Sequence, residues 1–304
     1  MDSISLVLTT IIQQYCKNIH SDVLLRNICY CSKLTKWRWS VYMPLSKEKI
    51  EGSLSLVIDT FKSLRPQLMK SYGNIDHIAK YDDSPVTELD VMVEEAIKTK
   101  LAREYPEIGF HGEETEDTPS TCDATWIVDP IDGTSSFIHG LPYCTNMAGL
   151  VVDGEIVASV IFQFPTNDLY TATKGGGAYK NGKRISVKNT ELNNSLVFAG
   201  SFAYKNLYPL FQPYKIGMFA PLGASGYEFT RLAEGNIQGV TKVRGGSLMH
   251  DTVPGVLIAL EAGAEVVSFE DDEYRYTTLS FIIGTNNFIE IVRQHHSKIS
   301  EIIS

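Results

Sequence analysis

The chain of 304 residues lacks several features that mark other classes of protein. It has no run of about eighteen apolar residues, so no transmembrane helix is expected. Its five cysteines are odd in number and scattered, which argues against a disulfide framework and favours a reducing, cytoplasmic environment. Lys and Arg form no dense block and the net charge is −9, so we expect no nucleic-acid partner.

The composition is that of a globular protein, with 43% hydrophobic and 21% charged residues, and the length suffices for a sizeable core. The first 42 residues differ from the rest, because five Lys or Arg face two Asp there and three of the five cysteines occur there. We therefore expect residues 1–42 to be a poorly specified extension and residues 43–304 to be the domain proper. A start codon assigned too early would also account for this segment.

Apolar residues at three- and four-residue spacing predict helices in several parts of the chain. The first is expected over 46–66, with its end disturbed by Pro66, and the second over 87–105. A later helix is expected over 227–234 and a last one over 251–263.

Turn signals predict antiparallel hairpins in the middle of the chain. Asp153-Gly154 and Asn181-Gly182 each separate two apolar segments and are typical of type I′ turns. The glycines at 175–177 lie within such a hairpin, so a dinucleotide-binding loop is not expected. Helices first, hairpins next and mixed elements at the end favour a layered α/β or α+β fold.

The segment "WIVDPIDGTSSF", residues 126–137, carries the main chemical signal. Three apolar residues predict a buried strand, and Asp129 and Asp132 follow at its end. Two carboxylates on one tight turn repel each other, so a cation is the natural reason to hold them together. Gly133 and Thr134 open a helix whose N–H groups suit a phosphate. In a purely structural interpretation, Asp132 caps that helix.

Other acidic residues lie at the ends of predicted elements. Glu113 and Glu114 follow a glycine after a short strand, and Asp251 stands at the start of a helix. Carboxylates with a backbone carbonyl are ligands for Mg²⁺, and two such ions about 4 Å apart clamp a phosphate and activate a water. Each residue also has a structural interpretation: Asp251 as an N-cap and Glu114 as a solvated charge.

Signatures of other chemistries are weak. The cysteines have no evident His partner, so a nucleophilic side chain is not expected. His295-His296 lies in a polar tail and is expected to face solvent.

Five motifs follow one another along the chain: "SPVTELD" (84–90), "GEE" (112–114), "DPIDGT" (129–134), "GGGAYKNGKRI" (175–185) and "HDTVPGVLIALEAGA" (250–264). In this order and spacing, residues 80–270 resemble the inositol monophosphatase family, a group of lithium-sensitive, magnesium-dependent phosphatases. The resemblance implies an αβαβα sandwich, two or three Mg²⁺ ions, inhibition by Li⁺ and a homodimer.

The resemblance also implies roles for single residues. Thr134, oriented by Asp90, would help Glu113 position the attacking water, although Asp90 also completes a capping box with Thr87. The implied metal ligands are Glu113, Asp129, the Ile131 carbonyl, Asp132 and Asp251. The implied substrate contacts are Asp132, Gly133, Thr134, Gly223, Ala224 and Ser225.

Two departures from the family concern the substrate. His250 stands where the family usually has Trp, and Arg244 falls near the place of an acidic residue that contacts an inositol hydroxyl. If Arg244 faces the pocket, it favours a second anionic group on the substrate; as a surface arginine it has no such role.

The expected function is Mg²⁺-dependent hydrolysis of a small phosphorylated polyol or sugar, such as inositol monophosphate, by water and without a covalent intermediate. The alternatives are a phosphatase for fructose 1,6-bisphosphate or a 3′-phosphonucleotide, and a catalytically weak regulatory homologue.

Overall fold

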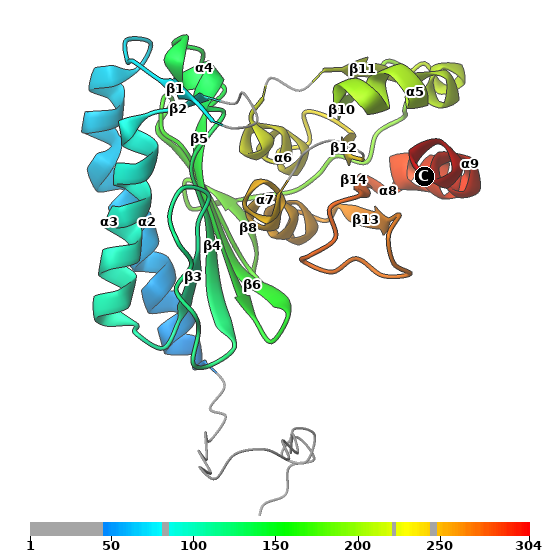
Figure 1. Ribbon diagram of the computed structural model, residues 1–304. Coiled ribbons are helices and arrows are strands. Elements are labelled where there is room, and N and C mark those ends of the chain that lie inside the picture. The colour runs from blue at the N-terminus through cyan, green and yellow to red at the C-terminus, as the bar shows by residue number, and fades with distance from the viewer. Residues whose placement is uncertain (1–44, 81–84, 221–222, 244–247) are drawn as a thin grey trace, which may run out of the picture. The chain divides into compact units, whose positions relative to one another are not determined.

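The computed structural model describes residues 45–80, 85–220, 223–243 and 248–304, so the expected extension over 1–42 lies outside the described residues. Figure 1 shows helices and sheets in alternating layers, which confirms the expected αβαβα sandwich. The helices are α2 (Lys47–Ser71), α3 (Glu88–Glu104), α4 (Thr134–Ile138), α5 (Ser201–Phe211), α6 (Ser225–Ala233), α7 (Met249–Glu261), α8 (Asn286–Gln294) and α9 (His296–Ile303). The strands are β1 (Ile78–Ala79), β2 (Pro85–Val86), β3 (Gly109–His111), β4 (Ala124–Asp132), β5 (Thr145–Val152), β6 (Glu155–Gln163), β7 (Asp168–Thr173), β8 (Gly177–Lys180), β9 (Lys183–Ile185), β10 (Leu196–Ala199), β11 (Gly217–Phe219), β12 (Gly239–Lys242), β13 (Glu265–Ser268) and β14 (Phe281–Gly284).

Helices α2 and α3 form the first layer. Helix α2 begins after Ser46 as predicted, but it continues through Pro66 to Ser71, so the expected end is wrong. The reason is tertiary packing: Leu68, beyond the proline, is fully buried. Burying such a side chain stabilises by about 1.5–3 kcal/mol, which offsets much of the roughly 3 kcal/mol that an interior proline costs.

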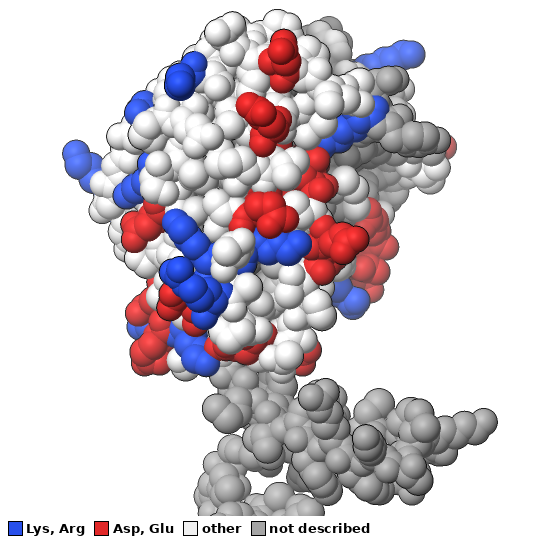
Figure 2. Space-filling view, turned by 60° about the vertical axis from the view of Figure 1, so that its left-hand side comes forward, with Lys and Arg blue, Asp and Glu red and all other residues white. Residues whose placement is uncertain are grey.

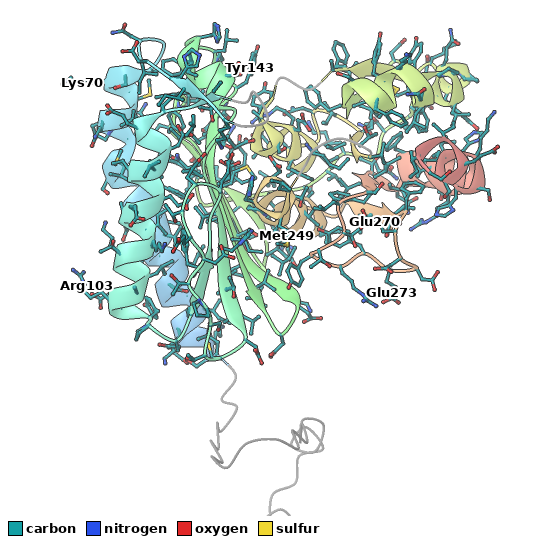
Figure 3. All side chains as sticks on the ribbon, in the orientation of Figure 1. Lys70, Arg103, Tyr143, Met249, Glu270 and Glu273 are labelled. Atoms are coloured by element: carbon teal, nitrogen blue, oxygen red, sulfur yellow. The ribbon has the colours of Figure 1, made fainter. Side chains whose placement is uncertain are left out.

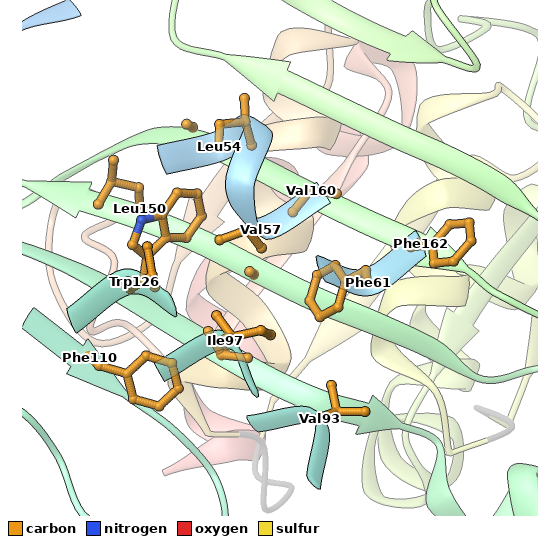
Figure 4. Close-up of a cluster of buried hydrophobic side chains, with 14 of the residues drawn as sticks. Leu54, Val57, Phe61, Val93, Ile97, Phe110, Trp126, Leu150, Val160 and Phe162 are labelled. Atoms are coloured by element: carbon orange, nitrogen blue, oxygen red, sulfur yellow. The ribbon is translucent and has the colours of Figure 1, made fainter. Parts of the chain in front are cut away.

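A seven-stranded sheet, in the order β3-β4-β5-β6-β7-β8-β9, packs against these helices. Trp126 and Val128 of β4 face α2 and α3, whereas Ile127 between them faces the next layer, as the two-residue period of a strand requires. Figure 4 shows Trp126 among the buried side chains of the first interface. The predicted hairpin at Asp153-Gly154 is confirmed, because both residues have positive φ, 52° and 79°.

Helices α6 and α7 form the middle layer, and a five-stranded sheet, β11-β10-β12-β14-β13, follows. Helices α5, α8 and α9 cover its far face. None of these three was predicted, and the expectation that His295 faces solvent is wrong. His295 is half-buried, with Nε2 3.3 Å from the Tyr214 hydroxyl, whereas His296 is exposed and stacks on Phe269.

Helix α7 is in close contact with both of its neighbours. A Cβ added to Gly149 of β5 would lie 2.9 Å from Val253 Cγ1, and one added to Gly255 would lie 2.0 Å from the Phe229 ring. These glycines therefore let α7 approach the large sheet and α6 more closely than any other residue would. In Figure 3, Met249 marks the start of α7, across the sheet from Lys70 and Arg103.

The surface in Figure 2 mixes acidic and basic side chains among the described residues. Within the described ranges, no helix combines the length and the apolar character needed to cross a membrane.

Candidate active site

Strand β4 ends in the two aspartates of the main motif, and both are buried, with 2% and 3% of Asp129 and Asp132 exposed. The pairing of β4 with β5 shifts register between them, so Pro130 and Ile131 leave the regular ladder while Asp129 pairs with Met147 and Asp132 with Thr145. Asp132 accepts hydrogen bonds from the N–H groups of Ser225 (2.7 Å) and Gly226 (2.8 Å) and from the Thr145 hydroxyl (2.8 Å). The start of α6 thus fixes this carboxylate.

Asp129 is the meeting point of the cluster. Its ligand atoms lie within 4.8 Å of those of Asp132 and Asp251, and a second group of the same span joins it to Glu113 and His250. Asp129 Oδ1 is buried and has no hydrogen-bond partner. The four carboxylates predicted as metal ligands therefore converge from three separate segments of the chain, as expected from the sequence.

Glu113 is positioned by Glu94, which the sequence analysis did not identify. The Glu94 carboxylate, on α3, accepts hydrogen bonds from the N–H groups of Glu113 (3.0 Å), Glu114 (2.9 Å) and Thr115 (2.8 Å). A Cβ added to Gly112 would lie 1.9 Å from Glu94 Oε1, so the loop needs glycine there. A buried glutamate in mid-helix has no sequence signal that separates it from a surface charge.

Lys80 neutralises part of this acidic loop. Its ammonium forms ion pairs with both Glu113 and Glu114. Only 10% of the Glu114 side chain is exposed, so the interpretation of Glu114 as a solvated charge is wrong.

Thr134 joins β4 to α3 through its hydroxyl. Oγ1 lies 2.9 Å from the Ile131 carbonyl and 3.2 Å from Asp90 Oδ1. Asp90 also accepts from the N–H (2.8 Å) and hydroxyl (2.6 Å) of Thr87, so the expected capping box and the contact with Thr134 coexist.

Asp251 is the third residue of α7, and its carboxylate accepts from the Leu248 N–H at 2.6 Å. The N-cap is Leu248, so the interpretation of Asp251 as the N-cap is wrong. Next to it, His250 places Nε2 3.8 Å from Glu113 Oε2 and 4.0 Å from Asp251 Oδ2.

The segment Gly223, Ala224 and Ser225 borders the same space. A Cβ added to Gly133 would lie 2.9 Å from the Ala224 Cβ and 2.6 Å from the Tyr143 carbonyl oxygen, which explains the glycine at a φ of 80°. Ser225 Oγ accepts a hydrogen bond from Lys242 Nζ at 2.8 Å. Arg244 lies outside the described residues.

Lys242 is a second group that the sequence analysis missed. Only 9% of its side chain is exposed, and its ammonium pairs with Oε2 of the buried Glu228 at 3.0 Å. Burial opposes the charge on Lys242, but Glu228 and Asp251 more than compensate and raise the pKa of its ammonium. The ammonium of Lys242 thus places a positive charge near Asp132.

The carboxylates of the cluster repel one another electrostatically. Burial, together with the charges of Glu113, Asp132 and Asp251, raises the pKa of Asp129 well above its ordinary value. Burial and Asp251 raise the pKa of Asp132 to about 7, although hydrogen bonds from Thr145 and Gly226 oppose the shift. Such a cluster is stabilised by a cation.

Inositol monophosphatases are among the curated proteins that this chain is similar to. Inositol monophosphatase 2 of Saccharomyces cerevisiae is 38% identical over 158 residues, which cover 49% of this chain and 54% of that protein. The fructose-1,6-bisphosphatase/inositol-1-monophosphatase of Methanocaldococcus jannaschii is 26% identical over 245 residues, 80% of this chain and 94% of that one. The chain spans about half the length of the first curated relatives it matches.

The solved structure of the IMPase of Thermotoga maritima matches with a TM-score of 0.71 at 25% identity, covering 84% of this chain and 99% of that one. The model of the inositol monophosphatase family matches residues 55–302. The members of this family are phosphatases that hydrolyse phosphate monoesters. With these matches and the convergent carboxylates, the chain belongs to the inositol monophosphatase family.

Proposed function

We propose that the chain hydrolyses phosphate monoesters of small polyols or sugars, inositol monophosphate among them, with bound Mg²⁺. The observation that carries the proposal is the cluster around Asp129, a buried carboxylate with an unpartnered oxygen and three further carboxylates close by. A concentration of negative charge of this kind is matched to divalent cations and, through them, to a phosphate dianion.

The donor set fits Mg²⁺, which prefers oxygen ligands. Asp129, Asp132 and Asp251 would hold one ion, and Glu113, Asp129 and the Ile131 carbonyl would hold another; Glu113 would be a ligand of any third ion. When bound, the ions supply charge neutralisation of the phosphate and a water of lowered pKa.

The chain's own residues orient the attacking water. With Asp90 accepting the hydroxyl proton of Thr134, the lone pairs of Thr134 Oγ1 are available to accept a hydrogen bond from that water. Glu113, held by Glu94 through the backbone, would accept the second hydrogen. The N–H groups of Gly133 and Thr134 would contact the phosphate, beside Asp132.

For the alcohol part of the substrate, we propose contact with Gly223, Ala224 and Ser225. Lys242 lies behind Ser225 with its charge shared by Glu228, so it orients the serine hydroxyl. Fructose 1,6-bisphosphate is the second candidate substrate, because the relative from Methanocaldococcus jannaschii carries both activities in its name.

The central experiment measures phosphate release from inositol, sugar and nucleotide phosphates by wild type, Asp129→Asn and Asp132→Asn. We expect wild type to prefer a polyol or sugar phosphate and each variant to lose activity by orders of magnitude while its circular dichroism stays unchanged. Asp153→Asn, in the hairpin turn, is the matched control and should keep full activity. Wild-type turnover in Asp129→Asn would contradict the metal assignment.

The proposal includes a cytoplasmic homodimer inhibited by Li⁺. Sedimentation velocity tests the dimer, and a titration with Li⁺ at fixed Mg²⁺ tests the inhibition. Activity that is indifferent to Li⁺ would argue against that part of the proposal alone.

A further inference from the structure

His250 brings a nitrogen atom into a cluster otherwise made of carboxylates. It is the second residue of α7, and 7% of its side chain is exposed. Its Nε2 atom lies 3.8 Å from Glu113 Oε2 and 4.0 Å from Asp251 Oδ2. The imidazole therefore faces the same space as the carboxylates proposed to hold metal ions.

The separations are those of two ligands on one ion. A distance of 3.8 Å is too long for a hydrogen bond. Bonds of about 2.0–2.2 Å from an ion to imidazole nitrogen and carboxylate oxygen place the ligand atoms about 3–4 Å apart. One ligand atom each of Glu113, Asp129 and His250 lies within 4.8 Å of the others.

Asp129 provides a second observation. Its buried Oδ1 has no hydrogen-bond partner, and a buried carboxylate oxygen is expensive to leave unpaired. A cation between Asp129, Glu113 and His250 would satisfy this oxygen.

The position of His250 is fixed by its helix. Gly149 and Gly255 allow α7 to pack closely against β5 and α6. The Asp251 carboxylate accepts a hydrogen bond from the Leu248 N–H and so stabilises the first turn. These contacts hold the body of α7, and with it the second residue of the helix, beside the cluster.

We propose that His250 is an imidazole ligand at the metal position of Glu113 and Asp129, and that this position prefers Mn²⁺, Co²⁺ or Zn²⁺ to Mg²⁺. The inference rests on the metal site of the proposed function. Imidazole suits later transition metals such as Co²⁺ and Zn²⁺, and Mn²⁺ accepts a nitrogen ligand more readily than Mg²⁺, which prefers oxygen. The position of Asp129, Asp132 and Asp251 offers oxygen alone and keeps its preference for Mg²⁺, so the chain has two metal positions of unlike chemistry.

The test uses the full chain loaded with Mn²⁺ and electron spin echo envelope modulation, which detects nitrogen bonded to the ion without any turnover. We expect modulation from a directly bound ¹⁴N. In protein made with ¹⁵N-histidine, this modulation should change to that of ¹⁵N. Because both measurements use the native sequence, neither depends on the folding of a variant.

Titration calorimetry with Mn²⁺ and with Mg²⁺ then identifies the histidine. His250→Gln should weaken Mn²⁺ binding about tenfold or more and change Mg²⁺ binding by less than about threefold. His139→Gln is the matched control, because His139 is exposed and bonds to the Ser135 carbonyl, and it should bind both ions as wild type does.

Each result has a distinct meaning. Mn²⁺ that binds without nitrogen modulation, or a His250→Gln variant with an unchanged Mn²⁺-to-Mg²⁺ preference, overturns the role of His250 and leaves the phosphatase proposal standing. A wild-type chain that binds neither ion overturns the metal site itself.

Discussion

At the scale of a single residue, Thr134 connects the end of β4 to Asp90 of α3 through one hydroxyl. Thr134→Val keeps the shape of the side chain and removes the hydroxyl, so the water loses one of its orienting partners. We expect kcat to fall about 100-fold or more, with KM and the urea unfolding midpoint close to wild type. Steady-state kinetics and urea titration provide these values.

The hydroxyl of Thr134, rather than the branched shape of its side chain, orients the water. Thr134→Ser retains the hydroxyl and should keep activity within about tenfold of wild type. Equal losses in the serine and valine variants would contradict the role given to Oγ1.

The pKa of Asp132 leads to a second prediction at the residue scale. The value rises from 3.8 to about 7 on folding of the metal-free chain, so the stability associated with this group is full below about pH 4 and is lost as the pH rises to about 7. Asn does not titrate. In EDTA, the free energy of unfolding of wild type minus that of Asp132→Asn should therefore fall between pH 4 and 7, by about 1.4 kcal/mol per pKa unit.

Urea unfolding of both proteins across this pH range measures the difference. Mg²⁺ at saturating concentration should flatten the slope, because the bound ion favours the carboxylate. A difference that rises with pH in EDTA would have the wrong sign for a carboxyl group destabilised by burial.

At the scale of elements, Glu94 fastens the loop that follows β3 to helix α3. Glu94→Gln replaces one accepting oxygen with a donating amide, which then opposes a backbone N–H. We expect the free energy of unfolding to fall by about 1–3 kcal/mol and the affinity for Mg²⁺ to fall about tenfold, because Glu113 is no longer held in place.

The neighbouring, exposed Glu95 offers the matched control. Glu95→Gln carries the same change of charge on the same helix and should alter neither quantity measurably. If the two variants behave alike in urea unfolding and Mg²⁺ titration, the loop does not depend on Glu94.

The sequence predicted elements well where the signal was local. Thr87 caps α3, and the turn at Asp153 forms the expected hairpin, because both depend on residues within a few positions of each other. It failed at Pro66, where packing by Leu68 continues the helix, and at α8 and α9, which the polar residues around His295 obscured. In both cases the deciding contacts are distant in the sequence.

At the scale of the whole molecule, site residues with a local sequence signal were also predicted, and those that depend on distant contacts were missed. Asp129, Asp132 and Asp251 were predicted because they stand at the end of a strand or the start of a helix, where functional side chains gather in layered folds. Glu94 and Lys242 were missed, because their partners are supplied only when separate layers meet. Nothing in their local sequence distinguishes them from surface charges.

Helix α7 has a consequence for how this scaffold can diversify. At Gly149 and Gly255 there is no spare volume between α7 and its neighbours, so larger side chains cannot be added at these contacts. Substitutions along the buried side of α7 should therefore be poorly tolerated. Gly223 has room for a Cβ, because no neighbouring atom lies within 4 Å, but its φ of 73° still favours glycine. A change of substrate in this scaffold is therefore expected to arise from residues outside the packed side of α7.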